Sequence, residues 1–374
     1  MVQRVMIIAG EASGDLHGSG LVRQLRKRNP SVDVFGVGGD RMAREGMRVV
    51  YHIRELGFMG FVEVIKHLPF IKVMEHTLEQ IVKFKKPEVL VLIDYPGFNL
   101  RFARKVRSYG MKIIYYISPQ VWAWHASRIK KMKKLVDAML VVFPFEVELY
   151  EKEGIPAEFV GHPLLEVLDS NVDRKNFCKR YGIDPGKKIL GLIPGSRKQE
   201  IERIFPVMLR AARMVAQEED VEIVVAVAPT LTEEYFRLMH NVDGVRLVSA
   251  ATYDVMRHST FAMVTSGTAT LETACFGTPM TVVYRTSWLT YLIGRLLVRV
   301  KNIGLVNIVA GKTIVPEFIQ HRATPSALAG KALEMLRDPD RSDAMRRELM
   351  LLREKLGTAG ASDRVARHVL QSEA

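Results

Sequence analysis

A carboxylate at the end of an apolar segment is the first candidate for chemistry in this sequence. Asp94 follows the run Val89–Ile93, whose composition predicts a buried β-strand, and Pro96 and Gly97 mark a turn directly after it. Ligands of open α/β sheets bind beyond the carboxyl ends of the strands, where Asp94 could take a proton from a hydroxyl group. An N-cap for the next helix is the alternative, and the residues by themselves leave both interpretations open.

A second candidate is the turn Gly10–Gly20, which follows the apolar run Val5–Ala9 and contains Glu11, Ser13 and Asp15. Glycine lets the backbone approach a ligand closely, and a helix N-terminus favours negative charge. The glycine spacing differs from that of the dinucleotide fingerprint. Two acids and a serine in one turn favour a substrate loop over a plain strand-to-helix turn.

The turn Pro194–Arg197 follows the apolar run Ile189–Ile193 and opens the next predicted helix. Backbone amides at Gly195 and Ser196, together with the guanidinium of Arg197, suit a diphosphate. A plain turn would also use glycine and serine, but it would not need the arginine. We therefore predict a phosphate site at this turn.

A similar turn follows the run Phe261–Thr265. Its residues Ser266, Gly267 and Thr268 offer amides and hydroxyls to phosphate, and Glu272 could accept hydrogen bonds from ribose hydroxyls. Helix capping by Thr268 is the alternative. Because both turns are expected at the same edge of one sheet, together they favour a nucleotide-sugar site.

Two apolar segments carry more large side chains than one helix face can bury. One covers residues 58–71 and includes Phe61 and Ile65, and the other covers residues 288–301. Charged residues within the first segment exclude a membrane span. Core packing is the usual alternative, but apolar surface flanked by cations favours contact with a membrane surface or with acyl chains.

The elements that must position these residues alternate between short β-branched runs and amphipathic stretches, which predicts βαβ units and parallel sheets. The pattern breaks after Gly161-His162-Pro163 and then starts again. We therefore predict an α/β fold with two Rossmann-like domains facing across a cleft. The predicted domains are residues 1–163 and 164–339, with residues 340–374 forming charged helices that pack across both. The predicted strands are Val5–Ala9, Val32–Val37, Val89–Ile93, Lys112–Ile117 and Ala138–Val142 in the first domain, and Ile189–Ile193, Val221–Ala226, Val245–Val248, Phe261–Thr265 and Met280–Tyr284 in the second.

Composition narrows the class of protein further. The chain has 374 residues and a formal net charge of +13, which calls for an anionic partner. No nucleic-acid-binding signature accompanies this charge, so we expect no nucleic acid partner. Two cysteines, no secretory signal and no uninterrupted apolar stretch of transmembrane length predict a cytoplasmic protein. The ten histidines show no ligand spacing, so we expect neither a metal nor a cofactor.

Taken together, these motifs resemble the lipid-A-disaccharide synthases, a family of inverting glycosyltransferases with the GT-B fold. The resemblance covers nearly the whole chain, and its tryptophan motif at 118–124 is highly specific. The motifs that carry it are Gly10–Asp15, Asp94–Leu100, Ser118–Trp124, Gly161–Pro163, Pro194–Arg197 and Ser266–Glu272, with further family segments at Val306–Val309 and Val315–Gln320.

The resemblance implies transfer of a sugar from UDP-2,3-diacylglucosamine to 2,3-diacylglucosamine 1-phosphate (lipid X), which releases UDP. It implies that Asp94 is the general base, with Glu11 on the acceptor side as the other candidate, and that Arg197, Glu272 and Asn307 belong to the donor site. The first domain would then bind the acceptor and face the membrane, and the second would bind the UDP-sugar. The residues expected to contact the acceptor or its lipid chains are Ser13, Asp15, Phe61, Ile65, Gln120, Trp122 and Trp124.

An inverting displacement needs a base on one side of the anomeric carbon and stabilisation of the departing diphosphate on the other. Asp94 and Arg197 come from different predicted domains, and arginine with helix N-termini makes a metal dispensable. The acyl chains of both substrates account for the apolar segments. We expect peripheral association with the anionic inner face of the inner membrane, and we leave open the oligomeric state, with a homodimer as one option.

Three alternatives remain at this stage. A UDP-N-acetylglucosamine epimerase shares the fold and donor site but leaves the apolar segments unexplained. Another lipid glycosyltransferase fits those segments but not the Ser118–Trp124 motif. A nucleotide-sugar sensor without catalysis would not need the carboxylate of Asp94.

Overall fold

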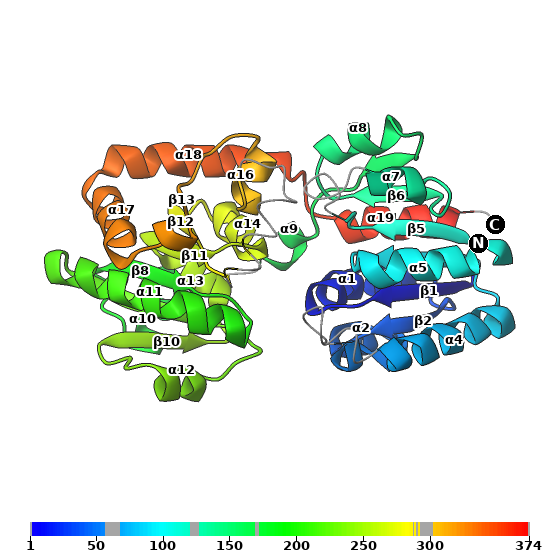
Figure 1. The fold of residues 1–374 in the computed structure, drawn as a ribbon, viewed down its shortest axis with the longest axis horizontal. Helices are drawn as coiled ribbons and strands as arrows, with labels where there is room; N and C mark the ends of the chain where they lie inside the picture. Colours follow the sequence, from blue (N-terminus) through cyan, green and yellow to red (C-terminus); the bar gives the residue numbers. More distant parts are fainter. Residues whose placement is uncertain are drawn as a thin grey trace. The chain divides into compact units, whose positions relative to one another are not determined.

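The computed structural model describes residues 2–56, 68–119, 127–168, 172–286, 288, 291 and 302–372. The chain divides into two compact units, of which the first comprises Met1–Glu166 with Leu356–Ala374 and the second comprises Val167–Lys355. The boundary was expected after residue 163, and residues 340–374 were expected to form a part of their own. Instead, helix α18 (Pro339–Lys355) ends the second unit and helix α19 (Ala361–Gln371) belongs to the first (Figure 1).

The first unit is built on a seven-stranded sheet in the order β3-β2-β1-β4-β5-β6-β7, in which all neighbouring strands pair in parallel. The central strands are runs of Val, Ile and Leu because both of their faces are buried. The strands are β1 (Arg4–Ala9), β2 (Asp33–Gly38), β3 (Arg48–His52), β4 (Val89–Ile93), β5 (Lys112–Tyr116), β6 (Ala138–Val141) and β7 (Ala157–Phe159).

Helices cover both faces of this sheet. On one face Met6 and Ile8 share a buried core with residues of α4 and α5. On the other face α1 lies so close that a Cβ atom at Gly18 would be 3.2 Å from the Cδ1 atom of Ile93. The helices of the first unit are α1 (Ala12–Arg28), α2 (Asp40–Arg44), η1 (Ile53–Leu56), α4 (Leu68–Lys85), α5 (Pro96–Val106), η2 (Arg107–Tyr109), α7 (Ser127–Met132), α8 (Phe145–Glu151) and α19, with α9 (Leu164–Val167) at the boundary.

The second unit repeats this architecture with a six-stranded parallel sheet in the order β10-β9-β8-β11-β12-β13. Its strands are β8 (Lys188–Ile193), β9 (Val221–Val227), β10 (Val245–Ser249), β11 (Phe261–Thr265), β12 (Met280–Tyr284) and β13 (Glu317–Ile319). Its helices are α10 (Arg174–Tyr181), α11 (Lys198–Glu218), α12 (Glu233–Met239), α13 (Thr252–His258), α14 (Thr268–Cys275), α16 (Leu305–Ala310), η3 (Gln320–Arg322), α17 (Pro325–Arg337) and α18.

The two parallel-sheet, Rossmann-like domains confirm the predicted α/β fold class. Every predicted strand is present, and no predicted end differs from the observed one by more than one residue. Three further strands, β3, β7 and β13, were not predicted, and all three lie at sheet edges. Within the described parts of the chain, none of the helices combines the length and apolar character needed to cross a bilayer.

Candidate active site

The strand order places the predicted turns at equivalent positions in the two sheets, after the two strands where the order of the strands changes direction. In each sheet, successive strands are added first toward one edge and then toward the other. The change occurs between β1 and β4 in the first sheet and between β8 and β11 in the second. Such a topological switch point is where open α/β sheets bind their ligands, at the carboxyl ends of the strands. Glu11 and Asp94 follow β1 and β4, and the two predicted phosphate turns follow β8 and β11. The topology therefore brings the candidates together in pairs, one pair in each unit.

Asp94 is held in an unusual backbone conformation. It has a φ of 45° and Tyr95 has a φ of 46°, so two consecutive residues without the freedom of glycine are left-handed. The N-cap of α5 is Tyr95, with no side-chain capping bond, so the alternative role of Asp94 as an N-cap is wrong. The carboxylate of Asp94 is left half-buried beside the end of β4.

The surroundings of Asp94 make it a better base than an exposed carboxylate. Burial and, to a lesser extent, the negative charge of Glu11 raise the pKa of Asp94, and a hydrogen bond from the backbone of Tyr95 opposes the rise; the net result is a pKa of about 6. A base is most effective when its pKa lies near the working pH. With this pKa, the carboxyl group of Asp94 is still mostly ionised at neutral pH and can accept a proton.

Glu11 and Gly10 form the neighbouring wall of this site. Glu11 is the N-cap residue of α1, but its side chain makes no capping bond. Its negative charge acts instead on Asp94, whose pKa it raises. A Cβ atom at Gly10 would lie 2.3 Å from the Cδ1 atom of Tyr95. The ring of Tyr95 therefore packs directly against Gly10, and the two turns can lie this close only because residue 10 is glycine.

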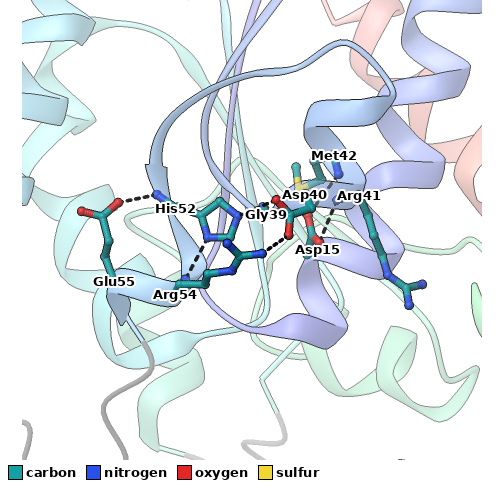
Figure 2. Close-up of polar contacts among 8 residues, drawn as sticks. All are labelled: Asp15, Gly39, Asp40, Arg41, Met42, His52, Arg54 and Glu55. Carbon is teal, nitrogen blue, oxygen red and sulfur yellow. Dashed lines mark hydrogen bonds and ion pairs between the residues drawn. The ribbon is translucent and has the colours of Figure 1, made fainter. Parts of the chain in front are cut away.

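Asp15 and Ser13 were predicted to contact the acceptor, and the structure separates them. Ser13 is exposed on the first turn of α1, whereas Asp15 is buried. The carboxylate of Asp15 accepts hydrogen bonds from the backbone amides of Gly39 (2.7 Å), Arg41 (3.2 Å) and Met42 (3.1 Å), as Figure 2 shows. Asp15 thus caps α2 from a different helix, and this geometry assigns it a structural role.

The segment Gly161-His162-Pro163 also lies in the first unit. The rings of His162 and His17 meet edge to face with centroids 6.2 Å apart. Burial lowers the pKa of His17 to about 4 and that of His162 to about 3. Both imidazoles are therefore neutral at pH 7, so neither can donate a proton as a charged imidazolium.

In the second unit, the turn after β8 has the shape of an anion site. Gly195 has a φ of 111°, and Arg197 is the N-cap residue of α11, whose first turn points its amides outward. The Thr230 hydroxyl donates to the carbonyl of Ser196 at 2.7 Å, which supports the turn from the neighbouring strand end. Arg197 is exposed and pairs with Glu200 at 3.2 Å. Its guanidinium could exchange this half-exposed partner for a phosphate at little cost.

The turn after β11 leaves room beside its backbone. Gly267 has a φ of 147° and is the N-cap residue of α14, and a Cβ atom there would meet nothing within 4 Å. The Ser266 hydroxyl donates to the carbonyl of Ile303 at 3.1 Å. Thr268 is the first residue of α14 and does not cap it, so the capping alternative for Thr268 is wrong. The amide of Ser266 donates to the carbonyl of Val283 at 3.1 Å, whereas the amides of Gly267 and Thr268 lie at the start of α14, where backbone amides have no partner within the helix.

Glu272 lies on α14, one turn beyond these amides. Burial raises its pKa to about 7, and a hydrogen bond with Tyr253 opposes the rise. At neutral pH this carboxyl group can both donate and accept hydrogen bonds, which matches the capacity of ribose hydroxyls.

Asn307 was expected in the donor site, but its side chain is fully occupied within the protein. Its Nδ2 atom donates to Val315 O and to Glu317 Oε1, each at 2.8 Å, and its Oδ1 atom accepts from the amides of Ile314 and Val315 at 2.8 and 3.0 Å. The residue is 0% exposed. Its geometry is that of a scaffold for the chain around α16, and its predicted contact with the donor stays a prediction.

Five predicted acceptor or lipid contacts lie outside the described residues, namely Phe61, Ile65, Gln120, Trp122 and Trp124. Sequence reasoning also missed residues that shape the site. Asn99 and Tyr115 both donate hydrogen bonds to the backbone of the Asp94 turn, yet neither was assigned a role. Asn99 entered only as part of the motif Asp94–Leu100, and a tyrosine inside an apolar strand carries no local signal of such a role. Among the residues that the structure describes, no group of three or more His, Cys, Asp or Glu side chains could hold a metal ion.

Two Rossmann-like domains, each built on a parallel sheet, define an α/β protein with the GT-B fold. Solved structures agree with this fold. The UDP-GlcNAc 2-epimerase of Neisseria meningitidis, bound to UDP-GlcNAc, matches with a TM-score of 0.68 at 13% identity, over 99% of this chain and 100% of that chain. The glycotransferase of kitacinnamycin matches with a TM-score of 0.66 at 14% identity, again over 99% and 100%.

The sequence comparisons are more specific than the fold. The family model described as Lipid-A-disaccharide synthetase matches residues 5–367. The Lipid-A-disaccharide synthase of Geobacter sulfurreducens is 43% identical over 371 residues, which covers 98% of this chain and 97% of that protein. The chain belongs to the lipid-A-disaccharide synthetase family.

Proposed function

We propose that this enzyme transfers 2,3-diacylglucosamine from UDP-2,3-diacylglucosamine to the 6-hydroxyl of 2,3-diacylglucosamine 1-phosphate, with inversion at the anomeric carbon. The products are the lipid A disaccharide 1-phosphate and UDP. The observation that carries the proposal is the full-length match to a lipid-A-disaccharide synthase at 43% identity. A glycosyltransferase role in lipid A biosynthesis follows from the family membership.

In the proposed step, the Asp94 carboxylate accepts the proton of the acceptor's 6-hydroxyl while that oxygen bonds to the anomeric carbon of the donor. The bond from the anomeric carbon to the diphosphate oxygen breaks, and its electron pair leaves with UDP. The raised pKa of Asp94, about 6, supports its role as the base. Glu11, which borders Asp94, is proposed to tune this pKa and to line the acceptor side.

The groups proposed to bind the donor all lie in the second unit. The amides of Ser196 and Gly267 and the guanidinium of Arg197 are proposed to hold the diphosphate, and Glu272 to hold the ribose. Fixed dipoles and an arginine stabilise a departing anion without needing to reorganise during the reaction. We therefore propose that transfer requires no metal ion.

The test is to incubate the purified protein with both lipid substrates in detergent micelles containing EDTA and to detect the disaccharide by mass spectrometry. We expect product from the wild type, none from Asp94→Ala, and wild-type turnover from the control Asp343→Ala, an exposed residue of α18. UDP binding should survive in all three proteins. Absence of product from the wild type with these lipids would contradict the proposed substrates. Activity that returned only on addition of a metal ion would contradict metal-independent transfer. Epimerisation of UDP-N-acetylglucosamine in the same assay would favour the epimerase alternative.

Peripheral association with the inner face of the inner membrane stays a prediction. The net charge of +13 supports it, as do the exposed lysines that follow α7, Lys133 and Lys134, with Lys130 and Lys131 on that helix. The two apolar segments at 58–71 and 288–301 lie largely outside the described residues.

A further inference from the structure

Three hydrogen bonds from buried side chains converge on the backbone where β4 ends. The hydroxyl of Tyr115 donates to the carbonyl oxygen of Asp94 at 2.5 Å. The Nδ2 atom of Asn99 donates to the same oxygen at 2.7 Å and to the carbonyl oxygen of Ile93 at 3.2 Å. Tyr115 and Asn99 are each 0% exposed, so both side chains reach the half-buried Asp94 turn from the interior of the unit. They come from two different elements, β5 and α5, that are assembled only in the folded unit.

The amide of Asp94 is held as well. It donates to the carbonyl oxygen of Tyr116 at 3.2 Å, which continues the pairing of β4 with β5 by one residue. Both backbone polar groups of Asp94 therefore have fixed partners. Because the amide and the carbonyl flank the Cα atom, fixing both also fixes the direction of the Cα–Cβ bond and hence the region that the carboxylate can reach.

This conformation would not persist without such support. A left-handed backbone conformation is unfavourable for a residue other than glycine, and here two such residues follow one another, with φ angles of 45° and 46°. Pro96 gives no such support, because a residue before proline prefers an extended conformation rather than the left-handed one that Tyr95 adopts. The carbonyl of Asp94 is the group that a relaxing turn would have to rotate, and it is the group that Tyr115 and Asn99 hold.

We propose that Tyr115 and Asn99 are positioning residues for the transfer reaction, and that they act by clamping the Asp94 carbonyl so that the Asp94 carboxylate is aimed at the acceptor hydroxyl. This inference rests on the proposed role of Asp94 as the base. Neither side chain touches a substrate in this scheme. Their effect on the reaction passes through the backbone of Asp94 alone.

The first test is Tyr115→Phe, which removes one oxygen atom and leaves the core packing intact. We expect kcat to fall about tenfold to a hundredfold, since a misplacement of the order of 1 Å has effects of this size. The KM for the donor and the melting temperature should change little. The acid limb of the pH profile should move to lower pH, because a carboxylate that can swing toward solvent has a lower pKa.

The matched control is Tyr116→Phe. Tyr116 is the next residue of β5, is equally buried, and directs its hydroxyl to the other face of the sheet, near Glu166 and Ser362. We expect wild-type kcat and an unshifted acid limb from this control. Equal effects of the two substitutions would overturn the proposal, because they would reflect a general response of the sheet to a lost hydroxyl.

Asn99→Leu is the second variant, and it removes both bonds from the amide while keeping a similar volume. It should lower kcat at least as much as Tyr115→Phe, measured on protein whose folded fraction is established by circular dichroism. If both variants turn over like the wild type while Asp94→Ala is inactive, the clamp is refuted and the base assignment stands. If Asp94→Ala itself is active, it is the proposed function of Asp94 that fails.

Discussion

At the scale of single residues, two carboxylates on adjacent strand ends influence one another. Asp94 and Glu11 follow β4 and β1, which pair directly, and the negative charge of Glu11 disfavours ionisation of Asp94. Burial has the larger effect on the pKa of Asp94. The two effects act in the same direction, and together they bring the pKa of Asp94, the proposed base, to about 6.

The pH dependence of turnover follows from this value. The base must be ionised to accept a proton, so kcat should fall as the pH drops below about 6. Glu11→Gln removes a charge that raises the pKa of Asp94, so the acid limb should move to lower pH. The measurement is kcat between pH 4.5 and 9 with a saturating concentration of both substrates. Glu148→Gln, which removes an exposed carboxylate on α8, should leave the limb in place. A Glu11→Gln profile that superimposes on the wild type would rule out the coupling.

At the scale of elements, short contacts between neighbouring turns hold the carboxyl edge of the first sheet together. Asp15 on α1 caps α2, while Asp40 on α2 pairs with Arg54 of η1 at 2.5 Å and with His52 of β3 at 3.3 Å (Figure 2). The Asp15 carboxylate is buried, whereas Asp40 and Arg54 are 53% and 76% exposed in their side chains. The buried contact should therefore matter more to stability than the exposed pair.

Asp15→Ala tests this ordering. It leaves three backbone amides without their acceptor, so we expect a loss of about 1–3 kcal/mol in the free energy of unfolding, measured by urea denaturation. Asp40→Ala, the neighbouring control, should lose at most about 1 kcal/mol, because an exposed ion pair contributes little. A structural role also predicts that folded Asp15→Ala keeps its KM for the acceptor. A large rise in that KM with unchanged stability would instead support the acceptor contact first expected for Asp15.

At the scale of the whole molecule, the chain returns to its first unit at the end. Helix α19 packs against α1, and its contacts with the first unit include a bidentate pair between Arg28 and Asp363, with both distances 2.8 Å. Ser362 donates from its backbone amide to Glu166 at 2.8 Å. The buried apolar face of α19 consists of Val365, Ala366, Val369 and Leu370. The first unit is therefore complete only when the last helix of the chain has docked.

Val369→Asp tests the importance of this helix. Val369 is 0% exposed, so an unpaired carboxylate there should cost about 3 kcal/mol or more in stability. Hydrogen exchange followed by mass spectrometry should show faster exchange in α1 and α19 but unchanged protection in α11 of the second unit. Gln371→Asp adds the same charge at an exposed position of α19 and should have little effect. Uniform loss of protection in both units would contradict the assignment of α19 to the first unit alone.

Much of this architecture could be predicted from local patterns. Runs of β-branched residues identified ten strands because both faces of a central parallel strand are buried, and turns with glycine after these runs predicted the strand ends at which the candidate ligand sites lie. The edge strands β3, β7 and β13 escaped prediction because their residues are mostly only partly buried, which weakens the apolar signal.

The tertiary structure decided how the individual side chains are used. Asp15 and Asn307 look like site residues in the sequence, yet backbone amides near Gly39 and Val315 occupy their polar atoms. Asn99 and Tyr115 look like a helix residue and a core residue, yet both hold the carbonyl of Asp94. The physical reason is that periodicity and turn chemistry are local, whereas hydrogen-bond partners are set by strand order. Tyr115 and Asp94 are 21 residues apart in sequence, and only the pairing of β4 with β5 makes them neighbours.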